Sequence, residues 1–144
     1  SALCLAEALE KDGKLVTIDV NEELEPLVND SFKSSPFGNQ IEFKIGNAQE
    51  IIPELSYKWD LVFIDADKEN YSNYFDLIVD KVSAGGYIIA DNVLWSGKVL
   101  EDDSQLDKDT IALKEYVKKL KGDNRVETVL LPVRDGLLIA RKLA

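Results

Sequence analysis

Residues 60–68, DLVFIDADK, contain an apolar run that is followed at once by charged side chains. A second stretch, residues 86–92 (GYIIADN), has the same plan. Short apolar runs bounded by polar residues predict buried strands at 60–64 and 86–90. In an open α/β sheet, ligands bind just beyond the carboxyl ends of parallel strands. We therefore expect Asp65, Asp67, Lys68, Asp91 and Asn92 to meet in one crevice.

This group of side chains predicts a cation site. Carboxylate and amide oxygens are the hard ligands that suit Mg²⁺ or a similar ion. Three carboxylates gathered without a cation would repel one another, and a lysine beside a cation is disposed to give up its proton. The alternative is that Asp67 and Asn92 cap helices while Lys68 is a solvated side chain. We favour the cation site.

The rest of the chain alternates predicted helices and strands. Helices are expected at 2–11, 21–31, 48–55, 71–82 and 107–121, and strands at 14–19, 41–46, 60–64, 87–90, 125–131 and 136–140. A loop is expected at 34–39, a turn at 83–86 and a polar connection at 92–106. This alternation predicts one α/β domain over residues 1–144, with a largely parallel sheet covered by helices. The short connection 132–135 favours an antiparallel final pair of strands.

Composition removes several classes of site. The 144 residues include no histidine, which excludes histidine zinc ligands and Ser-His triads from these residues. A single cysteine, Cys4, excludes an internal disulfide and fits a reducing compartment, so we expect a cytoplasmic protein. The net charge of −10 argues weakly against tight nucleic-acid binding. No window approaches the roughly 18 apolar residues of a membrane span.

Two further positions are open between a binding role and a local structural role. Asp19 closes a predicted strand, where an acidic side chain can bind a ribose diol or complement the dipole of the helix that begins near Asn21. The segment 46–50 (GNAQE) could pass close to a flat ligand, with Gln49 at one edge of a base. We favour the simpler interpretation there, a turn in which Asn47 caps the next helix.

The aromatic residues divide into two groups. Tyr71, Tyr74 and Phe75 lie at i, i+3 and i+4 of a predicted helix, which indicates packing. Trp95 stands in the polar connection just beyond the predicted cation ligands, where it could form a wall for a planar substrate. Cys4 lies among apolar residues and is expected to be inert core.

Five segments together resemble one family. They are TIDVNEE (17–23), IGNAQEIIPEL (45–55), WDLVFIDADKENY (59–71), GGYIIADNVLWSGKV (85–99) and LPVRDGLLIARK (131–142). In this order and spacing they resemble the cation-dependent O-methyltransferases, which include caffeoyl-CoA and catechol O-methyltransferases. The resemblance implies a Rossmann-like, doubly wound sheet of the class I methyltransferases. It also implies S-adenosylmethionine as methyl donor and a hydroxyl of a catechol-like or other vicinal-hydroxyl small molecule as acceptor.

The resemblance also implies roles for individual residues. The cation, Mg²⁺ or alternatively Mn²⁺ or Ca²⁺, is expected on Asp65, Asp91 and Asn92, with Lys68 taking the acceptor proton. The implied cofactor contacts are Ser1 near the methionine carboxylate, Asp19 on the ribose, Ala48 and Gln49 near the adenine, and Asp65. The implied substrate contacts are Asp67 and Ser96, beside the wall expected of Trp95.

The beginning of the chain departs from the family pattern. The chain begins within the predicted helix that should follow the first central strand and its glycine-rich turn. We therefore expect that these two features precede Ser1 in a longer polypeptide, and that the 144 residues alone are not a competent enzyme. A homodimer is also expected. The remaining alternatives are a tRNA hydroxyuridine O-methyltransferase of the same family and a non-catalytic remnant that binds cofactor or self-associates.

Overall fold

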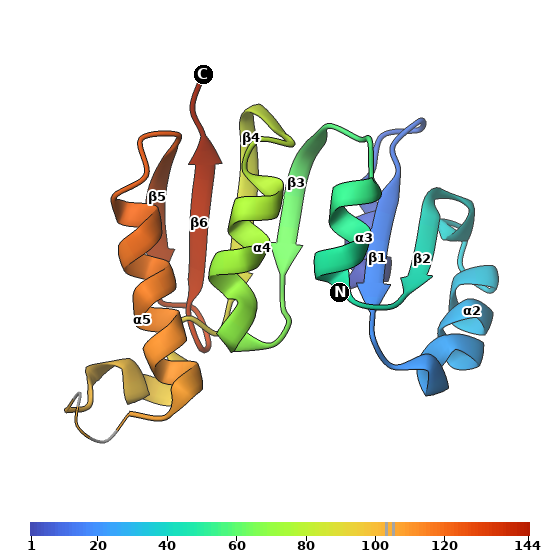
Figure 1. The fold of residues 1–144 in the computed structure, drawn as a ribbon. Helices are drawn as coiled ribbons and strands as arrows, with labels where there is room; N and C mark the ends of the chain where they lie inside the picture. The colour runs from blue at the N-terminus through green and yellow to red at the C-terminus, as the bar shows by residue number, and fades with distance from the viewer. Residues whose placement is uncertain (103, 105) are drawn as a thin grey trace. The chain divides into compact units, whose positions relative to one another are not determined.

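The structure, a computed structural model, describes residues 1–102, 104 and 106–144. The chain divides into two compact units, Ser1–Glu54 and Leu55–Ala144, which we call unit 1 and unit 2. Figure 1 shows the order of their elements. The polar connection predicted at 92–106 includes Asp103 and Gln105, which lie outside the described residues.

Unit 1 contains a two-stranded parallel sheet. β1 (Leu15–Asp19) pairs with β2 (Ile41–Ile45) over the whole length of both strands. The helical elements of the unit are α1 (Ala2–Glu7), η1 (Glu22–Leu24), α2 (Glu25–Lys33), η2 (Gly38–Gln40) and α3 (Ala48–Glu54). Asn21 caps η1, because its side chain accepts a hydrogen bond from the Glu23 amide at 3.0 Å.

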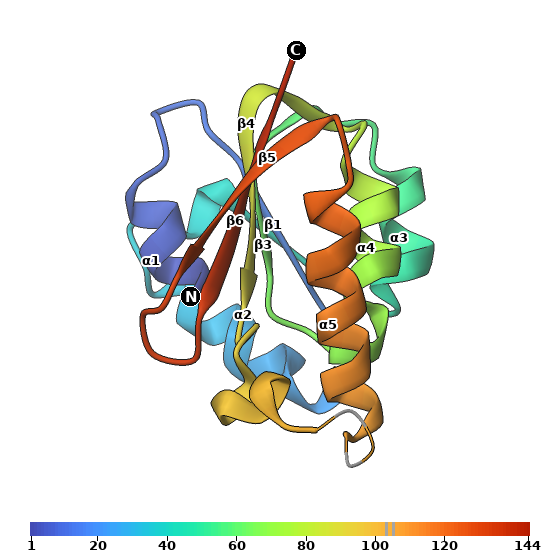
Figure 2. The ribbon, with the colours of Figure 1, turned by 90° about the vertical axis from the view of Figure 1, so that its left-hand side faces the viewer.

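Unit 2 is built on a four-stranded sheet in the order β3–β4–β6–β5. β3 (Trp59–Ile64) runs parallel to β4 (Val82–Asp91). β6 (Leu137–Lys142) is antiparallel to both β4 and β5 (Val126–Leu131). The helical elements are η3 (Lys68–Asn70), α4 (Tyr71–Ile78), η4 (Trp95–Leu100) and α5 (Lys108–Lys121). Figure 2 shows α4 and α5 on the same side of this sheet.

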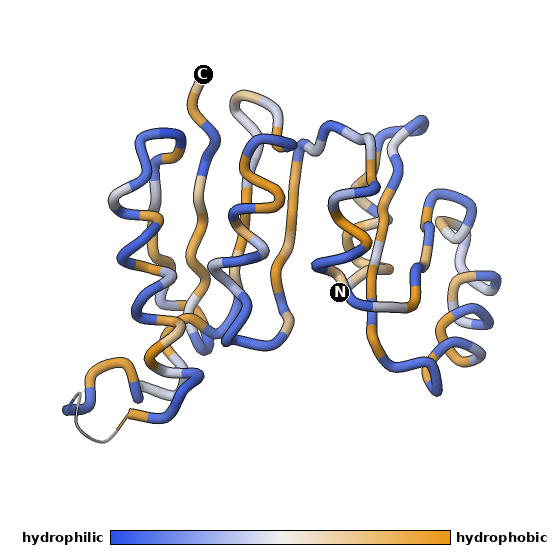
Figure 3. The backbone as a smooth tube through the Cα atoms, in the orientation of Figure 1, coloured by the Kyte–Doolittle hydropathy of each residue, from blue (hydrophilic) through white to orange (hydrophobic). Residues whose placement is uncertain are grey.

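The core lies mainly in unit 2. Figure 3 shows apolar positions along its strands and, alternating with polar ones, along α5. The residues that fill this core are Ile64, Tyr71, Phe75, Ile78, Val79, Ile88, Ala90, Leu113, Tyr116, Leu120, Leu138 and Ala140. Burial of large apolar side chains, each worth about 1.5–3 kcal/mol, holds α4 and α5 on the sheet. The packing of α4 and α5 therefore fixes the strand ends that carry the candidate site.

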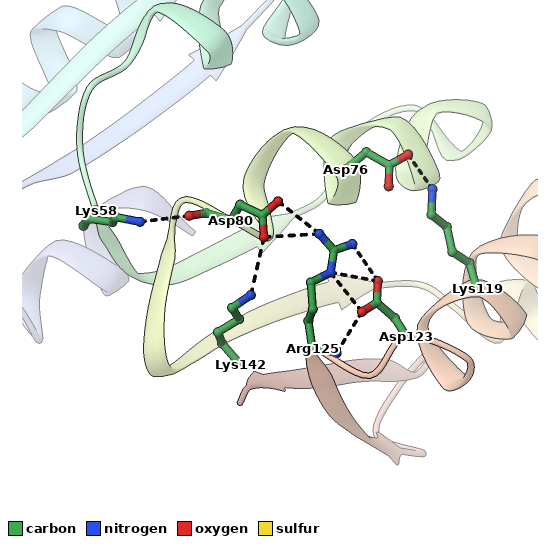
Figure 4. Close-up of polar contacts among 7 residues, drawn as sticks. All are labelled: Lys58, Asp76, Asp80, Lys119, Asp123, Arg125 and Lys142. Atoms are coloured by element: carbon green, nitrogen blue, oxygen red, sulfur yellow. Dashed lines mark hydrogen bonds and ion pairs between the residues drawn. The ribbon is translucent and has the colours of Figure 1, made fainter. Parts of the chain in front are cut away.

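A cluster of ion pairs lies at one end of this sheet, where β4 begins and β6 ends (Figure 4). The Arg125 guanidinium contacts the Asp123 carboxylate at 2.7 Å and the Asp80 carboxylate at 3.1 Å. Lys142 Nζ lies 3.6 Å from Asp80 Oδ1, and Lys58 Nζ donates to the Asp80 carbonyl oxygen at 2.9 Å. The cluster thus joins the chain segments that precede β3, β4 and β5 to the end of β6.

The α/β class and the antiparallel pairing of the last two strands are confirmed. The predicted strands at 14–19, 41–46, 60–64, 125–131 and 136–140 and the helices at 48–55 and 107–121 agree with the structure to within one or two residues. In the part of the chain that the structure describes, no helix is both long and apolar enough to cross a membrane.

Three predicted elements and one predicted burial were wrong. The first helix ends at Glu7 rather than at residue 11, because the Ala8 and Leu9 amides bind carbonyl oxygens three residues back, those of Leu5 and Ala6, at 3.2 Å. The fourth helix ends at Ile78 rather than at residue 82, because Val82 already pairs with Trp59 as the first residue of β4. The predicted turn 83–86 lies within β4. Its extra residues appear there as a shift in the register of β4 against β3. Cys4 is exposed rather than part of the core.

Candidate active site

The parallel strands β3 and β4 deliver the predicted polar residues to one edge of the sheet. Their last registered pair is Ile64 with Ala90, so Asp65 and Asp91 follow at matching positions. Lys68 Nζ lies 3.3 Å from Asn92 Oδ1 and 3.6 Å from Asp65 Oδ1. The structure therefore brings one amine, one amide oxygen and one carboxylate together, as the sequence predicts.

Lys68 is a buried lysine, with 6% of its surface exposed. Its ammonium donates to the Tyr71 hydroxyl at 2.5 Å and lies 4.7 Å from the centroid of the Tyr71 ring. The centroid of the Trp95 ring is 5.6 Å away, within the range of cation–π attraction. The alternative that Lys68 is a solvated surface residue is therefore wrong.

Tyr71 joins the two strand ends. Its hydroxyl lies 3.0 Å from the Asp91 carbonyl oxygen on β4 and 3.4 Å from the Ile64 carbonyl oxygen on β3. Burial raises the pKa of the Tyr71 hydroxyl, and the negative charges of Asp65 and then Asp91 raise it further. The phenol is therefore neutral at ordinary pH, and both carboxylates lie near it. The predicted packing role is confirmed, but the role of the hydroxyl was missed.

The turn that follows β4 is held in an unusual backbone conformation. Asn92 has φ +60°, and its backbone amide donates to Asp91 Oδ1 at 2.7 Å. The Val93 amide donates to the Gly136 carbonyl oxygen at 3.1 Å. Gly136, with φ +84°, lies so close that a Cβ there would be 2.5 Å from Leu94 Cγ. The turn before β6 thus holds Val93 and Leu94, the two residues that directly follow Asn92.

Trp95 and Ser96 continue this strained segment, with φ +49° and +55°. The Ser96 amide donates to Asp135 Oδ1 at 2.6 Å, and the Ser96 residue is exposed. Trp95 Nε1 is buried and has no hydrogen-bond partner among the described residues. Backbone strain and an orphaned buried donor beside Lys68 are features typical of a functional segment.

Asp67 does not join the other two acids. Its Oδ1 accepts from the Tyr74 hydroxyl at 2.6 Å, and its Oδ2 accepts from the Asn70 side-chain amide. Burial raises the pKa of Tyr74, and the hydrogen bond to Asp67 raises it further. Among the described residues, no three His, Cys, Asp or Glu side chains gather as metal ligands would. The prediction of three clustered carboxylates was therefore wrong, because the Asp67 carboxylate binds the Tyr74 hydroxyl instead.

The residues implied as cofactor contacts lie mostly in unit 1, at the carboxyl edge of its own sheet. The last pair of β1 and β2 is Asp19 with Ile45, and the Gly46 amide donates to the Asp19 carbonyl oxygen at 2.8 Å. Ala48 and Gln49 follow at the start of α3. Ser1 precedes α1 and is exposed.

Two side chains at this edge make local hydrogen bonds. Asp19 Oδ1 accepts from the Asn21 amide at 2.8 Å. Asn47 Oδ1 accepts from the Gln49 amide at 3.0 Å, which confirms that Asn47 caps the turn into α3.

Comparison with known proteins shows the family of the chain. Residues 1–143 match the family model described as O-methyltransferase. The chain is 38% identical to tricin synthase 2 of Oryza sativa, over 99% of the chain and 53% of that protein. It is 35% identical to caffeoyl-CoA O-methyltransferase of Medicago sativa, over 99% of the chain and 62% of that protein. The chain thus spans between about half and two thirds of the length of these relatives.

Solved structures agree with this result. The O-methyltransferase TomG of Streptomyces achromogenes, in complex with SAM, has a TM-score of 0.90 at 25% identity, over 99% of this chain and 67% of that one. The SAH-bound methyltransferase PaMTH1 of Podospora anserina has a TM-score of 0.83 at 27% identity, over 94% of this chain and 63% of that one. The fold and the sequence therefore lead to one conclusion: the chain belongs to the O-methyltransferase family.

Proposed function

We propose that this protein transfers a methyl group from S-adenosylmethionine to a hydroxyl of a catechol-like or other vicinal-hydroxyl small molecule, and that the transfer depends on a divalent cation. The observation that carries the proposal is the buried Lys68 ammonium, within 3.3 Å of Asn92 Oδ1 and 3.6 Å of Asp65 Oδ1. The family match and the caffeoyl-CoA O-methyltransferases among the relatives support it.

The donor set fits a hard divalent cation. Asp65 and Asp91 offer carboxylate oxygens and Asn92 an amide oxygen, which are the ligand types of Mg²⁺, with Mn²⁺ and Ca²⁺ as alternatives. The Asp65 side chain is 52% exposed, so it has room to take a ligand. When bound, such a cation would supply Lewis acidity that lowers the pKa of an acceptor hydroxyl and orients its oxygen.

Lys68 then acts as the base in this proposal. In its uncharged amine form, Lys68 Nζ would receive the proton of the acceptor hydroxyl, because an ammonium has no lone pair to accept one. The acceptor oxygen forms a bond to the methyl carbon as the bond from that carbon to the sulfonium sulfur breaks. The rest of the catalytic effect comes from placement of the two reactants. Trp95, with its ring beside Lys68, would form one wall for a planar acceptor, and Asp67 and Ser96 are proposed to contact it.

The cofactor contacts in the proposal are Ser1, Asp19, Ala48, Gln49 and Asp65, carried by the motifs that match the family. Asp19 retains one carboxylate oxygen, Oδ2, that is not the one bonded to Asn21. An acidic side chain at the end of a strand is the group that holds a ribose diol in related folds. Self-association into a homodimer belongs to the same proposal and rests on the family alone.

A methyl-transfer assay with matched acceptors tests the proposal. The full-length protein, with labelled S-adenosylmethionine and Mg²⁺, is offered catechol, resorcinol, a caffeoyl thioester of coenzyme A, and bulk tRNA. We expect transfer to catechol or the thioester, little to resorcinol because its hydroxyls are not vicinal, and loss of transfer with a chelator. Transfer that survives the chelator would contradict the cation. Label in tRNA alone would select the tRNA enzyme, and a protein inert with every acceptor would select the non-catalytic alternative.

A pair of lysine variants tests the base. Lys68→Met should lower kcat by about 10²–10⁴-fold, the usual contribution of a general base. Lys119→Met removes a lysine whose ammonium pairs with Asp76 at 2.5 Å on the surface of unit 2, and it should leave kcat unchanged. Wild-type kcat in Lys68→Met would remove Lys68 from the mechanism.

A further inference from the structure

We propose that Tyr71 is a positioning residue for Lys68, and that its hydroxyl holds Lys68 Nζ in place when a cation occupies the neighbouring oxygens. The inference rests on the proposed function. It goes beyond it in assigning a role to a side chain that packing alone would explain. Tyr71 is fully buried, and its hydroxyl lies 2.5 Å from Lys68 Nζ.

The Tyr71 hydroxyl is arranged to accept from Lys68. A phenol has one proton to donate and lone pairs to accept. The nearer of the two backbone carbonyl oxygens, that of Asp91, is 3.0 Å away and can take the proton. One lone pair can then accept from Lys68 Nζ, whose N–H groups donate to it.

The ring is fixed from several elements, so the hydroxyl has little freedom. Tyr71 begins α4, and its hydroxyl contacts the ends of both β3 and β4. Its ring packs edge-on against the ring of Tyr116 on α5, with centroids 5.5 Å apart. Because this hydrogen-bond acceptor is held in place, it restricts the position of the group that donates to it, Lys68 Nζ.

The hydrogen bond between Tyr71 and Lys68 would matter most for the position of Lys68 Nζ with a cation bound. Two of the polar side chains near Lys68 Nζ, Asn92 and Asp65, are the ones that the proposed function assigns to the cation. If their oxygens held an ion, they would no longer be directed at Lys68 Nζ. Among the described contacts of Lys68, the Tyr71 hydroxyl is the polar partner that does not depend on the cation.

The chain offers a matched control. Tyr116 is also fully buried in the same core, but in the described part of the chain its hydroxyl has no hydrogen-bond partner. Tyr116→Phe therefore removes a buried hydroxyl with the same loss of volume and without loss of a contact to Lys68. An effect confined to Tyr71→Phe reports the contact with Lys68 rather than a looser core.

The first experiment compares steady-state kinetics of the two variants in the full-length protein. Tyr71→Phe should lower kcat by about 10–100-fold, as expected for a reacting group that is misplaced by a fraction of an ångström to one ångström. The KM values for both substrates should stay within about twofold, since Tyr71 is proposed to contact neither. Tyr116→Phe should match the wild type. A wild-type kcat in Tyr71→Phe, or equal losses in both variants, would overturn the inference.

A second experiment needs no turnover. Acetic anhydride modifies accessible lysines, and mass spectrometry gives the rate at each position. In the wild type with Mg²⁺, Lys68 should react much more slowly than the exposed Lys108. In Tyr71→Phe, but not in Tyr116→Phe, the rate at Lys68 should rise. A wild-type Lys68 that reacts as fast as Lys108 would overturn the inference even if Tyr71→Phe does not fold.

The two proposals fail in different ways. If Lys68→Met keeps its activity, the base in the proposed function is wrong, but the modification rates still decide whether Tyr71 holds Lys68. If Lys68→Met is inactive while Tyr71→Phe is fully active, the base stands and the positioning role is wrong.

Discussion

The two ends of the four-stranded sheet in unit 2 carry charged side chains in opposite arrangements. At the end where β4 begins, Arg125 lies between Asp123 and Asp80, and Lys142 adds a second cation (Figure 4). At the end where β4 finishes, Lys68 is buried and its closest polar partner is a neutral phenol. The carboxylate near it, that of Asp65, is half exposed and 3.6 Å away.

This difference separates a structural cluster from a site. Charges that are paired and hydrogen-bonded to each other, as at Arg125, have little left to offer a ligand. At the other end, the half-exposed Asp65 carboxylate lies beside a buried amine, and the backbone is left-handed at Asn92, Trp95 and Ser96. Strain and incompletely paired charge are retained where they serve binding or chemistry. Substitutions at the two ends should therefore have opposite profiles.

The largest expected effect follows from one carboxylate at each end. Asp91→Ala should lower turnover on the order of 10³-fold, because it removes a proposed cation ligand. Binding of S-adenosylmethionine, measured by calorimetry, should be kept. Asp80→Ala, at the other end, removes a carboxylate of the same size and should leave turnover unchanged. Equal losses of turnover in the two variants would erase the distinction between the ends.

Next in size is a backbone effect on the turn that supports the site. Gly136→Ala should destabilise the fold by about 1–3 kcal/mol, because φ is +84° and the new Cβ would lie 2.5 Å from Leu94 Cγ. It should also reduce turnover, since the turn holds the segment that begins at Asn92. Gly122→Ala is the control, since its Cβ would meet only carbonyl oxygens at 3.7 Å. Urea unfolding measures both, and a Gly136→Ala protein as stable as Gly122→Ala would contradict the packing described.

A smaller effect is expected from the structural end. Arg125→Met should lower the free energy of unfolding by about 1 kcal/mol, because the guanidinium is 41% exposed and its ion pairs are partly screened. The kcat should not change. Denaturant unfolding at low and high salt should show a smaller difference from the wild type at high salt. A large loss of kcat would mean that this cluster also serves the site.

The smallest effect is a dependence on pH. The hydrogen bonds from Arg125 lower the pKa of Asp123 from its ordinary value of 3.8 to about 2. A carboxyl group with a lowered pKa in the folded state stabilises the fold above its unfolded pKa, and that contribution is lost as the pH falls from about 4 to about 2. Asp123→Asn should thus be less stable than the wild type at pH 6, and the difference should shrink toward pH 2. A difference that does not change with pH would contradict this assignment.

Much of the fold could be predicted because its signals are local. The apolar runs LVFI and YIIA end in charged residues, which placed β3, β4 and the edge that carries Asp65 and Asp91. The periodic apolar pattern of residues 107–121 placed α5, whose N-cap is Asp107, since Asp107 Oδ1 accepts from the Thr110 backbone amide at 2.8 Å. The early end of α1 was not predicted, because no glycine or proline between Glu7 and Gly13 signals it.

The candidate site was predicted in its members but not in its contacts. Spacing placed Lys68 near Asn92, as the structure bears out. Spacing could not show that the Tyr74 hydroxyl donates to Asp67, or that the Tyr71 hydroxyl accepts from Lys68. Aromatic residues at helical spacing indicate packing only. The left-handed backbone at Trp95 and Ser96 was also missed, since neither residue type signals it.

We propose above that the ends of β3 and β4 hold a divalent cation beside Lys68. The most direct test of this proposal is a crystal structure of the full-length protein, grown with Mn²⁺ and S-adenosylhomocysteine and measured at the manganese absorption edge. We expect an anomalous peak within bonding distance of oxygen atoms from Asp65, Asp91 and Asn92, with Lys68 Nζ adjacent but not bonded. No peak at this edge of the sheet at saturating Mn²⁺, or a peak held by other residues, would contradict it.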